Sequence, residues 1–132
     1  MKPVIKYQGG KTKELSRIKD FAPKEFKQIV EPFCGGSAVA LHYGDTCILN
    51  DVNKAVINLY REIGSDNYPT IQKAIDEIKT YDHDKLEEVF YSSRDIINDP
   101  DDYSNLEYAI AYIVVRQLCF SGMERYNSEG KF

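Results

Sequence analysis

One stretch of the sequence decides the fold: Glu31-Pro32-Phe33-Cys34-Gly35-Gly36-Ser37. The apolar run from Ile29 to Phe33 predicts a short buried strand, because a glycine loop stops it at once. Ser37 to His42 is then expected to open a helix. A strand that ends in paired glycines and leads into a helix is how doubly wound α/β proteins approach a nucleotide-like ligand. The dinucleotide fingerprint Gly-x-Gly-x-x-Gly is absent, which disfavours a nicotinamide dinucleotide.

The second predicted strand ends in an acidic residue that suits the same kind of ligand. Thr46 to Leu49 forms this strand, and Asn50-Asp51 stops it. A carboxylate at that position can accept hydrogen bonds from both ribose hydroxyls of a nucleoside. An equally good interpretation from this residue alone is that Asp51 or Asn53 caps the helix that follows.

A basic loop with two glycines precedes the first strand. Its sequence is Tyr7-Gln8-Gly9-Gly10-Lys11, and a helix is expected from about Lys13 to Asp20. A lysine that follows two glycines could meet an anionic group of a ligand. The alternative is a solvated basic turn.

The chain becomes helical after Gly64. Apolar residues at helical spacing predict three helices, over 67–79, 82–97 and 102–120. Two apolar stripes are expected to pack in the core: Ile71, Ala74, Ile75 and Ile78, then Leu106, Ala109, Ile110, Ile113 and Val114. The fold class is therefore α/β, with a sheet that is begun but not completed, followed by a helical insert.

Size and charge limit the function classes. The 132 residues suit one domain with a modest core. A formal net charge of −4 argues against nucleic-acid binding by bulk charge alone, although basic residues gather near both ends of the chain. No apolar run approaches the roughly 20 residues of a membrane span, and the N-terminus is too polar for a signal peptide. We therefore expect no membrane partner and a cytoplasmic location.

The cysteines and histidines predict neither a disulfide framework nor a metal site. Cys34, Cys47 and Cys119 are widely spaced and form no Cys-x-x-Cys pair. Each has apolar neighbours in the sequence, so a buried thiol is expected at all three positions. His42 and His83 each lack a second ligand at metal spacing.

Taken in order, these motifs resemble the Dam-type (D12 class) adenine-N6 DNA methyltransferases and their phage relatives. That family opens with aromatic-x-Gly-Gly-Lys, matched by 7–11, and continues with Asp/Glu-x-Phe-x-Gly, matched by 31–35. An Asn/Ala-Asp-x-Asn segment follows at 50–53, then Ile57 and Tyr60 in an Ile-x-x-Tyr pattern. The last motif is Phe-Ser/Asn-x-Met-x-Arg-x-Asn-x-x-Gly-x-Phe, which matches 120–132.

The resemblance implies a fold and a set of site residues. The fold would be an incomplete Rossmann-like S-adenosylmethionine-dependent methyltransferase fold. Residues 1–64 would form the N-terminal part of the cofactor domain, and 65–132 a helical insert that begins the DNA target-recognition region. The implied cofactor-binding residues are Tyr7, Gly9, Gly10, Lys11, Glu31, Phe33, Gly35 and Asp51, and the implied DNA-binding residues are Arg116, Arg125 and Asn127.

Two departures from the family pattern bear on activity. Ser37 stands where many members have a second motif glycine. The catalytic Asp-Pro-Pro-Tyr is absent, since the only Asp-Pro is Asp99-Pro100, followed by Asp101 in an acidic turn. We therefore assign no catalytic residue and expect a truncated, cofactor-binding portion of a site-specific adenine-N6 methyltransferase, inactive alone. Its expected partners are double-stranded DNA and either the missing C-terminal half or a second copy. The alternative is a stand-alone, non-catalytic binding protein that acts as an inhibitor or regulator.

Overall fold

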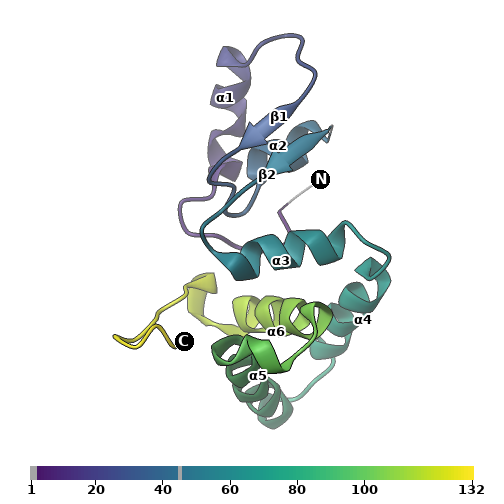
Figure 1. The fold of residues 1–132 in the computed structure, drawn as a ribbon, viewed down its shortest axis with the longest axis vertical. Coiled ribbons are helices and arrows are strands. Elements are labelled where there is room, and N and C mark those ends of the chain that lie inside the picture. Colours follow the sequence, from purple (N-terminus) through teal and green to yellow (C-terminus); the bar gives the residue numbers. More distant parts are fainter. Residues whose placement is uncertain (1–2, 45) are drawn as a thin grey trace.

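The structure, a computed structural model, describes residues 3–44 and 46–132. Figure 1 shows a small sheet with its helices at one end and a helical group at the other, with α3 between them. A 3-10 turn (Lys11–Glu14) leads into α1 (Leu15–Phe21), and 3-10 turns also lie at Pro100–Asp102 and Phe120–Gly122. The other elements are β1 (Ile29–Glu31), α2 (Ala38–Tyr43), β2 (Cys47–Leu49), α3 (Lys54–Ile63), α4 (Tyr68–Ile78), α5 (His83–Asn98) and α6 (Asn105–Leu118).

The two strands pair in parallel, with α2 as the connection between them. Ile29 lies opposite Cys47, and Glu31 lies opposite Leu49. Parallel neighbours need such a crossover, so the strand–loop–helix–strand order in the sequence determines this pairing. The α/β class is thereby confirmed in its coarse form, as a helix-rich chain with a small parallel sheet. The Rossmann-like detail stays a prediction.

The expectation of a buried first strand is wrong. Val30 is 57% exposed, and Phe33 just beyond the strand is 89% exposed. Both strands of a two-stranded sheet are edge strands, and each is only three residues long, so neighbours cover their side chains only in part. The same reason corrects the expectation for Cys47, whose side chain is exposed on β2.

The three predicted helices of the second half are present, and side-chain caps fix where two of them begin. Asp82 accepts a hydrogen bond from Lys85 N at the start of α5. Ser104 and Glu107 form a capping box, so α6 begins at Asn105 rather than near Asp102. None of the helices within 3–44 and 46–132 is long and apolar enough to cross a membrane.

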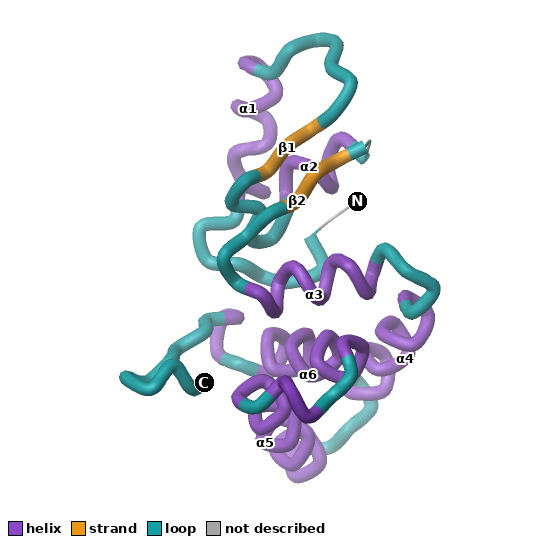
Figure 2. Tube along the Cα trace, in the orientation of Figure 1, coloured by secondary structure: helices purple, strands orange, loops and turns teal. Residues whose placement is uncertain are grey.

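Helix α6 is the centre of the helical group, and Figure 2 shows it among α3, α4 and α5. It contacts all three of these helices. Ala109 and every residue from Ala111 to Arg116 are buried, a wider band than the predicted stripe. A helix that is covered on several sides needs apolar residues around most of its circumference. The buried C-terminal half of α6 therefore lies beside the N-terminal segment, residues 3–10.

Candidate functional site

A hollow of about 290 Å³ lies where the two strands end. Its size is near the lower end of the range for small-molecule sites, about 300–1,000 Å³. Its walls come from the basic loop, the glycine loop and the residue after β2. All eight residues that the sequence assigned to a cofactor line this one hollow: Tyr7, Gly9, Gly10, Lys11, Glu31, Phe33, Gly35 and Asp51.

The Tyr7 ring packs directly on the glycine loop. A Cβ atom placed on Gly35 would lie 2.9 Å from Tyr7 Cδ1, and one on Gly36 would lie 3.1 Å from Tyr7 Cβ. Gly35 also has a φ of +46°, in the left-handed region that side chains disfavour. The paired glycines thus give the Tyr7 ring its place at the wall of the hollow.

Asp51 joins the glycine loop to the start of α3. Its Oδ2 accepts a hydrogen bond from Gly35 N at 2.8 Å, and its Oδ1 accepts one from Asn53 N at 3.0 Å. The helix cap is Asn53, whose side chain accepts from Ala55 N and Val56 N. Each carboxylate oxygen of Asp51 keeps a further lone pair, so it can still accept hydrogen bonds from a ligand in the hollow.

The other polar groups of the hollow add donors and positive charge. Burial, with Asp51 and Glu124 nearby, raises the pKa of Tyr7. Its hydroxyl can donate a hydrogen bond. Lys11 is exposed, and its Nζ donates to Gly9 O at 3.0 Å. Burial also raises the pKa of Glu31. With the exposed Phe33 ring, the hollow offers an aromatic face, a cation and a carboxylate.

The three residues implied to contact DNA do not lie together. Arg125 and Asn127 are on the exposed segment after α6, where Asn127 Oδ1 accepts from Glu129 N and Lys131 N within a tight turn. Arg116 is only 4% exposed, and its guanidinium points inward. This placement does not fit the expected DNA contact, because Arg116 is already paired with Glu124.

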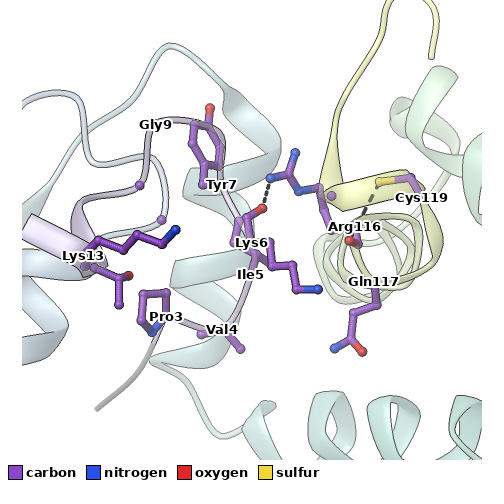
Figure 3. Close-up of a pocket in the computed structure, with 15 residues that line it drawn as sticks. Pro3, Val4, Ile5, Lys6, Tyr7, Gly9, Lys13, Arg116, Gln117 and Cys119 are labelled. Atoms are coloured by element: carbon purple, nitrogen blue, oxygen red, sulfur yellow. Dashed lines mark hydrogen bonds between the residues drawn. The ribbon is translucent and has the colours of Figure 1, made fainter.

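A larger hollow of about 720 Å³ adjoins the first one and was not anticipated (Figure 3). Tyr7, Gly9, Gly10, Gly36 and Ala38 line both, so the N-terminal segment forms the boundary between them. Arg116 lines only the larger one. The sequence also gave no sign of Glu124, which falls at a variable position of the last motif.

The thiols are not gathered into a site. Cys34 is buried, Cys119 is half-buried, and burial raises the pKa of each. Across the described residues, no group of three or more His, Cys, Asp or Glu side chains is placed to hold a metal ion.

A parallel α/β unit with a glycine loop and a carboxylate at its strand ends is typical of proteins that bind nucleosides. Residues 7–132 match the family model of the D12 class N6 adenine-specific DNA methyltransferases. The chain belongs to this family.

Individual relatives agree with the family match. Over its whole length the chain is 36% identical to the Type II methyltransferase M.CviBI of Paramecium bursaria Chlorella virus NC1A, of which it covers 48%. It is 30% identical to the Type II methyltransferase M.MjaIII of Methanocaldococcus jannaschii, of which it covers 50%. Over 98% of the chain it is 33% identical to the DNA N-6-adenine-methyltransferase of Escherichia phage P1, of which it covers 17%. The chain thus spans about half the length of the first two.

Proposed function

We propose that this chain forms the S-adenosylmethionine-binding part of a DNA adenine-N6 methyltransferase. One observation carries the proposal: three loops that are distant in sequence line one hollow, and together they contribute all eight residues that the family motifs assign to the cofactor. The family match supplies the identity of the ligand, because methyltransferases of this class take their methyl group from S-adenosylmethionine.

The residues present fit that cofactor. Asp51 keeps lone pairs for the ribose hydroxyls, as a carboxylate after the second strand does in nucleoside sites. Lys11 and Tyr7 are proposed to lie near the methionine part, where a cation and a hydroxyl donor suit a carboxylate. The Phe33 ring is free to stack against a flat base. When bound, the cofactor supplies a methyl group activated by a positively charged sulfur.

We propose double-stranded DNA as the partner of the segment after α6. Arg125 and Asn127 are exposed there, and such side chains contact phosphates and base edges. Arg116 is left out of this interface because its guanidinium is buried. The molecule's net charge is negative, so binding must rely on local groups rather than on overall charge.

The chain by itself is proposed to bind the cofactor without transferring its methyl group. Transfer to adenine requires the base to be held out of the stack with its amino nitrogen aligned on the methyl group. The family's Asp-Pro-Pro-Tyr motif, which would hold that amino group, does not occur in this sequence. Asp99-Pro100 does not replace it, because it lies in the turn between α5 and α6, where Asp99 pairs with Lys131.

Calorimetric titration of S-adenosylmethionine into the full chain tests cofactor binding. Phe33→Ala and Lys11→Ala alter exposed side chains of the hollow, so they should leave the fold intact. Phe21→Ala is the matched control, since Phe21 is 81% exposed on α1 and outside the hollow. We expect saturable binding that weakens about tenfold in Phe33→Ala, from the lost aromatic contact, and is unchanged in Phe21→Ala. Absence of binding by a cooperatively folded chain would reject the proposal.

A further inference from the structure

A buried ion pair lies between α6 and the segment that follows it. Arg116 Nη1 is 2.8 Å from Glu124 Oε1, and the two side chains are 3% and 12% exposed. Removing charges from water is costly, and the further hydrogen bonds of both side chains offset part of that cost. The partners of this pair therefore show what it holds in place.

Arg116 reaches the N-terminal segment at two points. Its Nη2 donates a hydrogen bond to Lys6 O, drawn as a dashed line in Figure 3. Its guanidinium carbon lies 5.1 Å from the centroid of the Tyr7 ring, within range of a cation–π contact. One side chain thus holds both the backbone just before Tyr7 and the ring itself.

Glu124 fixes the orientation of the guanidinium. Besides Arg116, it accepts hydrogen bonds from the Tyr112 hydroxyl, from Tyr126 OH at 2.9 Å and from Asn53 Nδ2 at 3.1 Å. These donors come from α6, from the C-terminal segment and from the cap of α3. The Glu124 carboxylate is consequently held by three separate parts of the chain, and it in turn accepts a hydrogen bond from Arg116 Nη1.

We propose that Arg116 is a positioning residue that holds Tyr7 on the glycine loop and thereby shapes one wall of the cofactor hollow. The role rests on the proposed function. Arg116 does not line the cofactor hollow, so it acts through Tyr7 and not by touching the ligand. If the Arg116–Glu124 pair were only structural, it would stabilise the junction of α6 and the C-terminal segment without affecting the position of Tyr7.

Arg116→Lys separates these two roles. A lysine keeps the charge that Glu124 needs, but a single ammonium cannot reproduce a planar fork that serves Glu124 and Lys6 O together. The matched control is Arg94→Lys on α5. Arg94 also lies over a ring, 4.8 Å from the Tyr91 centroid, and 3.7 Å from an oxygen of Asp95, but it is remote from the hollow in sequence and in contacts.

Hydrogen–deuterium exchange in the full chain gives a readout that does not depend on ligand. Gly10 N donates to Tyr7 O at 2.9 Å, so exchange of the Gly10 amide reports on how firmly the loop of 7–11 is held. We expect Arg116→Lys to speed exchange there about tenfold while α5 keeps its protection, and Arg94→Lys to change nothing at 7–11. Wild-type exchange at 7–11 in Arg116→Lys would overturn the proposal.

If Arg116→Lys does not fold, Arg116→Met combined with Glu124→Gln takes its place in the same measurement. That pair of substitutions removes both buried charges, so neither is left without a partner. Faster exchange at 7–11 in this variant supports the role of Arg116, and unchanged exchange rejects it.

A double-mutant cycle with Tyr7→Ala then tests whether Arg116 affects S-adenosylmethionine binding through Tyr7. Arg116→Lys should raise the Kd about tenfold in the wild-type background and leave it unchanged in the Tyr7→Ala background. Additive losses would show that Arg116 acts independently of Tyr7 and would overturn the proposal. If the wild-type chain binds no S-adenosylmethionine, the proposed function fails, while the exchange measurement still decides the role of Arg116.

Discussion

The Oδ2 atom of Asp51 accepts a hydrogen bond from the backbone nitrogen of Gly35, 2.8 Å away and sixteen residues earlier in the chain. Each of these residues follows a strand, so the bond ties the two strand-end loops together. Parallel strands place their carboxyl ends at the same edge of a sheet, which is why loops separated in sequence meet here. The carboxylate that is proposed to bind ribose is therefore also part of the scaffold.

Substitution of Asp51 should consequently affect stability as well as binding. Asp51→Ala removes the acceptor of two backbone N–H groups, and we expect the free energy of unfolding to fall by about 1–3 kcal/mol. Asp51→Asn keeps one acceptor oxygen and should cost less. Urea denaturation without ligand measures both changes. Equal stability of Asp51→Ala and the wild type would show that these bonds contribute nothing.

Gly35→Ala should be more damaging than an alanine at another left-handed glycine. The new Cβ would lie 2.9 Å from the Tyr7 ring, on a backbone with φ of +46°. Gly44→Ala is the matched control, because Gly44 has φ of +74° and no atom within 4 Å of the added Cβ. We expect both to lose about 1–2 kcal/mol to backbone strain. Only Gly35→Ala should also abolish cofactor binding, which titration calorimetry would show.

Ser37 occupies a position better suited to glycine. Its φ is +48°, and it is the only non-glycine residue with a left-handed backbone within 3–44 and 46–132. Ser37→Gly and Ser37→Ala both remove the hydroxyl, but only the glycine variant removes the Cβ. We expect Ser37→Gly to be more stable than Ser37→Ala by about 1 kcal/mol in thermal unfolding. The opposite order would mean that contacts of the Cβ outweigh the strain.

Buried tyrosines should set the alkaline limit of stability. Burial raises the pKa of Tyr60 from 10.0 to about 12, and burial together with Glu124 raises the pKa of Tyr112. A group whose pKa is higher in the folded state adds stability that is complete below its unfolded pKa and disappears as the pH rises through its folded pKa. The urea midpoint should therefore be lower at pH 12 than at pH 9.

Tyr60→Phe tests this assignment, since it removes one of the hydroxyls whose pKa is raised by burial. Its loss of stability above pH 10 should be less steep than that of the wild type. Tyr103→Phe, at an exposed surface tyrosine, should leave the alkaline profile unchanged. Identical profiles for all three proteins would mean that Tyr60 does not contribute to the alkaline transition.

Local signals in the sequence were sufficient to predict the helices, whereas the grouping of the cofactor-binding residues came from the family resemblance. Asn53 was expected as a possible cap, and its side chain does accept the first free N–H groups of α3. The order strand, glycine loop, helix, strand predicted an α/β unit, and its two strands pair in parallel. The burial of the strands could not be predicted in this way. It depends on how many strands and helices cover the sheet, not on the residues of Ile29–Glu31 alone.

The role of Arg116 could not be predicted from its surroundings in the sequence. A basic residue near the start of a family motif for DNA contact is expected to face phosphate. Its partners are instead Glu124, eight residues later, and the carbonyl of Lys6, 110 residues earlier. No local pattern records a pairing between the two ends of the chain. The structure brings these ends together at α6, where Arg116 donates a hydrogen bond to Lys6 O.

The packing of Tyr7 on Gly35 has a consequence for how this family can evolve. A side chain at position 35 would compete with the ring at position 7 for the same space. Mutations at these two sites should therefore be epistatic: an alanine at 35 that is harmful beside a tyrosine should be better tolerated beside a smaller residue.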